Sequence, residues 1–348
     1  MTTTNLTETP ATSRAVSIIA SMPGRVPWQK EAVALAIAFA LLALTPFVFT
    51  DSYSRHVLIM VFIYAIVASN WDLSLGYGGV FNFGHIALFG IGVYAYSLLT
   101  KLVAMDPWLA MIVSGVVAVV AAVVVTIPIL RLKGIYIILV TFGFAQLVMQ
   151  IILSQSDYTG GTQGLVRIPS LYWFDHNMVR DAKFAYFYIA LALLLASTIF
   201  LRIFVRSRMG ISIVALRDNE EYAVSRGISL VRQRLITLAA SAFFTGVAGA
   251  FYAAYQRNAS VEVFGMSLAT IVLSMVLLGG TGTIYGAIIA SFALTVFAEA
   301  MADFGAWRPI ITAVLILIVM LVYPGGIVGM LKGATDFVFS RRGPATKA

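Results

Sequence analysis

The stretch from Pro107 to Leu130 reads PWLAMIVSGVVAVVAAVVVTIPIL and contains no Lys, Arg, Asp or Glu. A helix of this length would rise about 36 Å at ~1.5 Å per residue, more than the ~30 Å hydrocarbon core of a bilayer. Similar runs recur along nearly the whole chain, which is 60% hydrophobic and only 11% charged. Because the runs are continuous and do not alternate with polar residues, they indicate membrane-spanning helices and not a barrel.

The hydrophobic runs predict an all-α polytopic membrane bundle of about ten helices. The eighth run is short, at about 21 Å, and glycines interrupt the third. Short, Gly-interrupted segments at matching positions of two halves are typical of transporters built from inverted repeats. We therefore interpret spans two to five and seven to ten as a possible inverted repeat. The expected spans are Ala32–Phe49, Val57–Leu75, Gly84–Leu99, Pro107–Leu130, Gly134–Leu153, Phe184–Val205, Leu235–Tyr255, Gly265–Leu278, Ile284–Ala300 and Pro309–Val322.

The basic residues set the expected orientation. With the N-terminus inside, the inside segments hold more than twice as many Lys and Arg residues as the outside segments. Cytoplasmic loops of membrane proteins carry this excess, so the formal charge of +8 needs no nucleic acid to explain it. We expect one permease domain, residues 32–330, between cytoplasmic tails 1–31 and 331–348.

Two polar connections are long enough to have roles of their own: an outer loop, residues 154–183, and a strongly basic inner segment, residues 206–234. The inner segment has helix-forming character from Gly210, and Gly227 stands where a helix could end through a left-handed residue. We expect a short surface helix, a glycine turn and re-entry into the membrane. Such a helix could dock on a cytoplasmic motor, although an ordinary basic loop would show the same composition.

Two glycine-rich stretches interrupt apolar sequence, GYGGVFNFGH at residues 76–85 and GGTGTIYG at residues 279–286. Glycine lets the backbone leave a helix or lets two helices approach closely. The first stretch is therefore either a broken helix lining a substrate pathway or a tight turn. The candidate pathway residues are Asn70, Gly78, Gly79, Asn82, His85, Gly279 and Gly280. For the polar ones, hydrogen bonds between helices are the alternative role.

Several kinds of chemistry find no support in the sequence. The chain has no cysteine, and no second His lies at metal-ligand spacing from His85, so no metal is expected. There is no convergent catalytic set and no phosphate-binding Gly-x-x-x-x-Gly-Lys-Ser/Thr loop. If ATP drives this protein, another chain must bind it.

Four segments resemble, in order and spacing, the branched-chain amino acid permeases of ABC importers, and in particular the larger of the two paired permeases. They are the stretches 76–85 and 279–286, the outer TGGTQGL of residues 159–165, and the inner stretch from Met209 to Ile228. The resemblance covers about residues 57–332.

The resemblance implies a transport subunit of a bacterial inner membrane, not an enzyme, that imports branched-chain or related amino acids by alternating access. It implies a second permease, two ATPase subunits that hydrolyse the ATP, and a periplasmic binding protein; this chain would bind no cofactor. The residues expected to couple to the ATPases are Arg217, Asp218, Glu220, Glu221, Ala223 and Gly227. The residues expected to receive the binding protein are Gly160, Gly161, Gln163 and Gly164.

Two other functions stay open. A self-sufficient, ion-coupled secondary transporter would need carboxylates at membrane depth, and Asp72 is a weak candidate. The pair Glu299 and Asp303 lies near an outer helix end, where a solvated position is expected. A membrane-embedded enzyme would need a set of acids, bases or metal ligands that the sequence does not offer.

Overall fold

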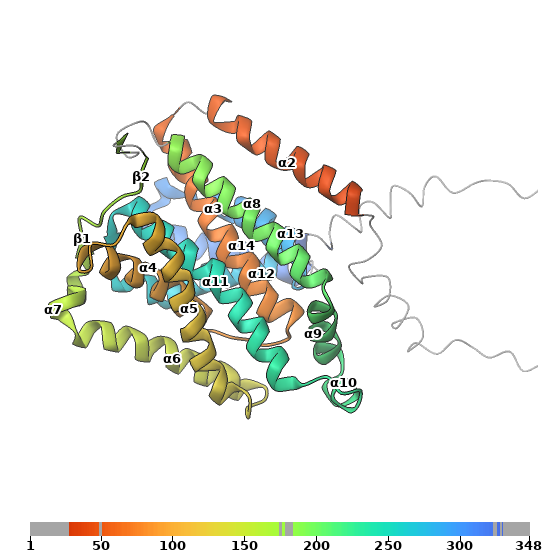
Figure 1. The fold of residues 1–348 in the computed structure, drawn as a ribbon. Helices are drawn as coiled ribbons and strands as arrows, with labels where there is room; N and C mark the ends of the chain where they lie inside the picture. The colour runs from red at the N-terminus through yellow and green to blue at the C-terminus, as the bar shows by residue number, and fades with distance from the viewer. Residues whose placement is uncertain are drawn as a thin grey trace, which may run out of the picture.

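The computed structural model describes residues 28–48, 51–173, 176–177, 184–322, 326–327 and 329. The expected tail 331–348 lies outside these residues, as does the expected tail 1–31 up to residue 27. Within them, the chain is a bundle of helices (Figure 1), which confirms the all-α polytopic fold class. Six helices of the described residues are long and apolar enough to cross a membrane, and shorter apolar helices accompany them.

Each of the ten expected spans coincides with a helix. The ten helices are α2 (Trp28–Val48), α3 (Ser52–Asp72), α4 (His85–Lys101), α5 (Pro107–Ile129), α6 (Ile135–Ser154), α8 (Phe184–Arg206), α11 (Leu230–Gln256), α12 (Met266–Gly279), α13 (Ile284–Ala300) and α14 (Arg308–Val322). A π-helical turn, η1 (Leu73–Tyr77), prolongs α3.

Short elements connect the long helices at the two ends of the bundle. At one end lie α7 (Ser156–Thr159), η2 (Gly161–Gln163), β1 (Leu165–Val166) and β2 (Tyr172–Trp173), and at the other lie α9 (Arg208–Asp218) and α10 (Glu220–Ser225) (Figure 1). The remaining short elements are β3 (His176–Asn177), β4 (Asn258–Ala259), η3 (Val261–Phe264) and η4 (Ala302–Trp307). The expected outer loop and inner segment therefore occupy opposite ends of the molecule.

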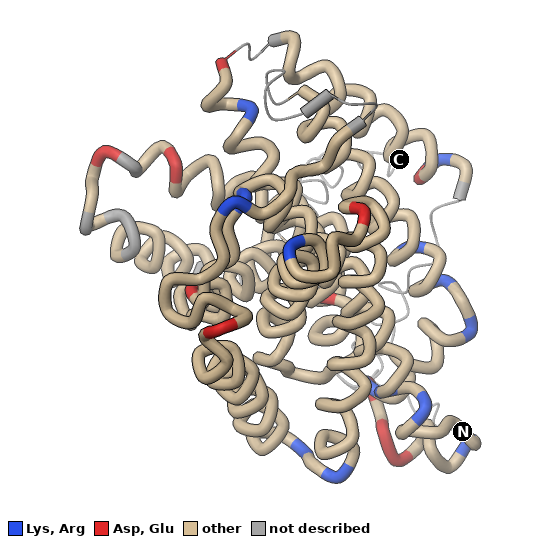
Figure 2. The backbone as a smooth tube through the Cα atoms, turned by 60° about the vertical axis from the view of Figure 1, so that its left-hand side comes forward, with Lys and Arg blue, Asp and Glu red and all other residues tan. Residues whose placement is uncertain are grey.

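The charged residues of the described chain follow this division. In Figure 2 most Lys, Arg, Asp and Glu positions lie at helix ends and in connections, and long stretches of the tube carry none. Uncharged stretches between charged ends are what a helix crossing hydrocarbon requires.

The helices pack in a pattern that repeats between the two halves of the chain. α4 and α5 contact one another and α11, and correspondingly α12 and α13 contact one another and α3. The first helix of each half is thus exchanged into the other half. α3 and α11 are the second and seventh spans, so they run in opposite directions across the bundle. This exchange fits the inverted repeat expected of spans two to five and seven to ten.

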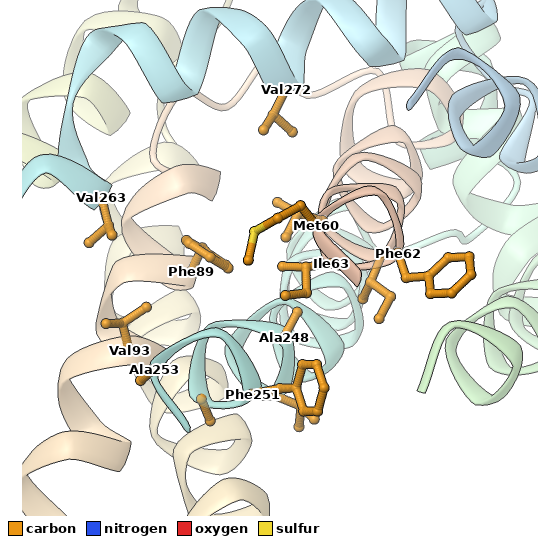
Figure 3. Packing of buried hydrophobic residues seen from close by; sticks show 14 of the residues in the cluster. Met60, Phe62, Ile63, Phe89, Val93, Ala248, Phe251, Ala253, Val263 and Val272 are labelled. Carbon is orange, nitrogen blue, oxygen red and sulfur yellow. The ribbon is translucent and has the colours of Figure 1, made fainter. Parts of the chain in front are cut away.

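The core lies where α3, α4 and α11 meet. Figure 3 shows Met60 and Ile63 of α3 facing Phe89 of α4 and Ala248 of α11. Of these, Ile63 and Ala248 are wholly buried. The same apolar cluster continues to Val272 of α12, so a single core joins both halves.

Glycines set the distance between α4 and α11. A Cβ atom on Gly92 would overlap with the backbone of Gly246, and one on Gly249 would overlap with the carbonyl of Phe89. Small residues at helix crossings allow this approach in membrane proteins. The contact between the two halves therefore depends on positions without side chains.

We expect Gly92→Val to destabilise the protein by about 1–3 kcal/mol, the usual cost of forcing extra atoms into a well-packed interior. The readout is the midpoint of thermal unfolding of the purified chain in detergent. The matched control is Gly143→Ala on α6, where a Cβ would meet nothing within 4 Å and where alanine favours the helix. Equal midpoints for the two variants would contradict the close approach.

Candidate functional site

The inner segment forms two helices, not the single surface helix expected from its sequence. Ser207 caps α9 by accepting a hydrogen bond from the Gly210 N–H at 3.3 Å. The chain then breaks at Asn219, whose backbone is extended and whose side chain accepts the Tyr222 N–H at 2.9 Å. An asparagine that caps the following helix cannot continue the preceding one, so α9 ends and α10 begins there.

The predicted left-handed glycine ends α10. Gly227 has φ of +86°, and the Ile228 N–H reaches back to the Ala223 carbonyl at 3.1 Å. This closure is the usual way in which a glycine satisfies the last carbonyls of a helix. Ser229 then caps α11, which begins five residues before the expected start of the seventh span. Its first turn therefore belongs to the inner segment.

Arg217 connects α9 to the glycine-rich stretch that follows α3. Its Nη1 donates to the Gly76 carbonyl at 2.7 Å, while Nε and Nη2 donate to Asp218 at 2.9 and 2.8 Å. A Cβ on Gly79 would lie 2.7 Å from Cγ of Arg217. Because Gly79 has no side chain, the turn leaves room for the side chain of Arg217.

The two glycine-rich stretches meet beneath Arg217. A Cβ on Gly76 would overlap with the backbone of Gly282, and the Gly282 N–H donates to Oδ1 of the buried Asp72 at 2.8 Å. We call Asp72, Gly76, Arg217 and Gly282 the glycine junction. It joins the end of α3, the α12–α13 connection and α9.

The glycine junction contains residues that the sequence-based site left out. Gly76 and Gly282 both lie inside the quoted glycine-rich stretches, but nothing in their spacing shows that the two stretches touch. The sequence offered Asp72 as a weak candidate for an ion-coupling carboxylate. In the structure Asp72 is buried, its Oδ1 accepts the Gly282 N–H, and its Oδ2 has no hydrogen-bond partner.

A cavity of about 210 Å³ opens beside the glycine junction, between the 78–80 segment, α9 and the start of α11. Glu220 lies at its edge and forms ion pairs with Arg234 of α11 and with Lys133 of the α5–α6 connection, each at 3.1 Å. Oε1 of Gln233, also on the lining, is buried without a hydrogen-bond partner. Glu220 therefore fixes α10 to the bundle, whereas Glu221 is exposed.

The polar residues expected on a substrate pathway make contacts within the protein. Asn70 donates to Ser197 at 2.7 Å, Asn82 accepts the Gly84 N–H at 2.8 Å, and His85 stacks on Trp71 and contacts Thr245 at 2.9 Å. All three candidates are wholly buried. The contacts of Asn70 and His85 agree with the alternative role in helix packing, whereas Asn82 bonds within its own turn. A part in a pathway stays a prediction for all three.

The glycine candidates divide between backbone turns and close contacts. Gly78 and Gly79 line the cavity beside the glycine junction. A Cβ on Gly279 would overlap with Gly286 of α13, and Gly280 has φ of +94°. The 279–286 stretch is therefore a tight turn that brings α12 and α13 together.

The outer glycines shape a turn. Gly160 and Gly164 have φ of +75° and +71°, and a Cβ on Gly164 would overlap with the carbonyl of Ala259. This approach lets β1 pair with β4, Leu165 opposite Ala259, which ties the outer connections of the two halves together. Of the four expected docking residues, Gly161 is buried and Gln163 presents an exposed side chain.

Asp106 anchors the rest of the outer loop. It caps α5 by accepting the N–H groups of Trp108 and Leu109, and the Tyr172 hydroxyl donates to it at 2.6 Å. The Tyr172 hydrogen bond lowers the pKa of the Asp106 carboxyl below its ordinary value. The loop around Tyr172 is thus attached to a charged helix end.

The described residues contain no group of three or more His, Cys, Asp or Glu side chains placed to hold a metal ion. The groups that the structure gathers at the inner end are a buried carboxylate, guanidinium groups and glycine backbone. Such an arrangement binds elements of the protein to one another.

Comparison with known proteins gives consistent similarities. Residues 54–324 match the family described as "Branched-chain amino acid transport system / permease component". The chain is 29% identical over 294 residues to the high-affinity branched-chain amino acid transport system permease protein LivM of Escherichia coli K12, covering 78% of this chain and 69% of that one. It is 26% identical over 292 residues to LivH of the same strain, covering 76% and 91%.

A more distant relative comes from an archaeon. The probable branched-chain amino acid transport permease protein LivM of Methanocaldococcus jannaschii is 24% identical over 254 residues, covering 63% of this chain and 73% of that one. No solved structure gives a significant match.

We expect Gly227→Val to disorder the turn between α10 and α11 and so to block docking of a motor on this segment. A Cβ at this position meets nothing within 4 Å, so the effect comes from the backbone alone, at about 1–3 kcal/mol for a strained conformation. The measurement is hydrogen exchange of the amides in residues 220–234, together with retention of co-purifying ATPase. Gly227→Asn is the control, because asparagine tolerates left-handed φ. Normal ATPase retention by the valine variant would refute the role of this turn.

Proposed function

The chain belongs to the family of permease components of branched-chain amino acid transport systems, and from this we propose that it is a membrane-spanning subunit of an ATP-driven importer of branched-chain or related amino acids. The importer would hold a second permease and two ATPase subunits, and a periplasmic binding protein would deliver the ligand. The subunit would lie in a bacterial inner membrane with both termini in the cytoplasm. Transport would proceed by alternating access.

The glycine junction is the observation that carries this proposal. An importer whose motor is a separate chain needs a rigid link from its cytoplasmic surface to its transmembrane helices. Arg217 of α9 donates to Gly76, at the end of α3, and Gly76 lies directly against Gly282, before α13, since a Cβ on Gly76 would overlap with the Gly282 backbone. A displacement of α9 would therefore act on both halves of the repeat at once.

The outer surface of α9 and α10 suits a protein partner. Ile211 and Tyr222 are 64% and 61% exposed, and Val224 is 47% exposed, although the segment lies at the charged end of the bundle. Exposed apolar side chains rimmed by polar ones are typical of protein interfaces. A groove on each ATPase would cover these residues and meet the charged rim of Asp218, Glu221 and Arg226.

The family also favours the substrate class. LivM and LivH of Escherichia coli are both named as permease proteins of a branched-chain amino acid transport system. A zwitterion with an aliphatic side chain needs no buried formal charge to bind it. One oxygen of the buried Asp72 accepts the Gly282 N–H, which gives this carboxylate a structural role in the glycine junction.

The proposal is tested by gently extracting the tagged chain from its native membrane and identifying the proteins that co-purify. We expect an ATP-binding protein and a second permease. Uptake of the amino acid should persist when proton and sodium gradients are collapsed while ATP is maintained. Recovery of the chain alone after cross-linking in the membrane, with uptake abolished by loss of the gradients, would favour the ion-coupled secondary transporter.

We expect Arg217→Gln to reduce amino-acid uptake at least tenfold while the complex still assembles and hydrolyses ATP. The lost hydrogen bond to Gly76 involves a charged donor, worth about 1.5–3 kcal/mol, so α9 would move without the glycine-rich stretches. The measurement compares uptake with ATP hydrolysis in reconstituted vesicles. Arg208→Gln is the matched control, because this arginine lies on the exposed side of the same helix. Equal uptake by the two variants would remove Arg217 from the coupling.

A further inference from the structure

We propose that the groove between α2, α8 and α13 binds one anionic phospholipid of the cytoplasmic leaflet, with an acyl chain along the groove and the phosphate at Arg202 and Arg206. This inference concerns the lipid-facing side of the bundle and does not depend on the transported substrate.

The groove has an apolar lining and runs along α2 from Glu31 to Thr45. Its volume is about 590 Å³, within the ~300–1,000 Å³ range of small-molecule sites. Along α2 it extends from Glu31 to Thr45, about 21 Å at ~1.5 Å per residue. One leaflet is about 15 Å deep, half of the hydrocarbon core, so the groove is long enough for an acyl chain. Its apolar lining includes Ala34, Ala38, Leu42, Leu194, Ile288 and Phe292.

Small side chains on α2 leave this space open. Ala34 and Ala38 lie one turn apart on the side that lines the groove, and only 6% of the apolar window of α2 is buried inside the protein. Phe39 and Leu42 of the same helix pack against the core of the bundle. α2 is therefore attached along one edge, and hydrocarbon chains of the surrounding bilayer have access to the other.

Charged groups close the inner end of the groove. Glu31 of α2 forms ion pairs with Arg202 and Arg206 of α8 and accepts the Tyr285 hydroxyl at 3.0 Å. One carboxylate thus faces two guanidinium groups, and the neighbouring Lys30 is exposed. The arginine and lysine charge exceeds that of Glu31, the single acid on the described lining of the groove, so the inner end is positive.

The guanidinium group of Arg202 retains a donor for an anion. Nε of Arg202 is buried and has no hydrogen-bond partner. Arginine binds phosphate through several parallel N–H donors. Arg206 is the last residue of α8 and leads into α9, so these donors lie at the end where the sequence places the cytoplasm. Basic pockets between helices on this side bind the head groups of anionic lipids.

Charge and shape together select a phospholipid. A soluble phosphate would leave the long apolar groove unfilled, and an uncharged lipid would leave the positive charge in excess of Glu31 unbalanced. A phospholipid with a net negative head group satisfies both features. It would also fill the space between α2 and the rest of the bundle.

Native mass spectrometry of the purified protein, titrated with phosphatidylglycerol or phosphatidylcholine, tests the site. We expect one tightly bound phosphatidylglycerol per chain, lost in Ala38→Phe because the ring fills the groove. Ala36→Phe is the matched control, since Ala36 is exposed and does not line the groove. The same phosphatidylglycerol binding in both variants would overturn the proposal.

Arg206→Gln tests the head-group contact without filling the groove. The ion pair between Arg202 and Glu31 remains, and removal of one basic group near a membrane surface should weaken phosphatidylglycerol binding about fivefold, from ~1 kcal/mol per basic residue. Binding of phosphatidylcholine should not change. An equal loss for both lipids would overturn the assignment of an anionic head group.

A cross-linking experiment distinguishes lipid from protein in the groove. The chain has no cysteine, so Ala38→Cys introduces a single attachment point for a photoreactive label. We expect cross-links to lipid in native membranes. A cross-link to a protein segment, from this chain or from another, would show that the groove is a protein interface and would refute the lipid site.

Discussion

The backbone contact between Gly76 and Gly282 is the constraint on which the inner end of this protein depends. It brings together two connections that are distant in the sequence, and it exists because neither residue carries a side chain. Asp72 holds the contact through the Gly282 N–H, and Arg217 holds it through the Gly76 carbonyl. The carboxylate of Asp72 and the guanidinium group of Arg217 thus both bond to the backbone of this contact. Through Arg217, α9 is connected to both halves of the bundle.

The sequence was a good guide to the helices because its signals there were strong. The membrane requires long, uncharged, internally hydrogen-bonded segments, and such segments are visible without a structure. Even the short eighth span was found as α12, with ends one residue away. The left-handed turn at Gly227 was also predictable, since a glycine after a short helix is a local signal. The break at Asn219 was missed, because an asparagine between two polar residues reads equally well as part of one helix.

The site was harder to predict, because its geometry comes from contacts between distant segments. Asn70, Asn82 and His85 were selected as polar residues near span ends, yet their partners lie in other helices or in their own turn. Sequence alone cannot tell a buried hydrogen bond between helices from a pathway group. The same limit applies to Gly160 and Gly164, whose freedom of backbone conformation serves the pairing of β1 with β4.

The exchange of α3 and α11 between the two halves has a consequence for synthesis. α4 and α5 are made early, but the helix that packs against both of them, α11, is complete only about 130 residues after the end of α5. At 5–20 residues per second, the ribosome needs roughly 6–26 s to deliver it. During that interval the surfaces of α4 and α5 that contact α11 in the folded protein, which include Gly92 and Ala118, lack their partner helix. The first half therefore completes its packing only when the second half supplies α11. The native bundle cannot form until nearly three quarters of the chain has emerged.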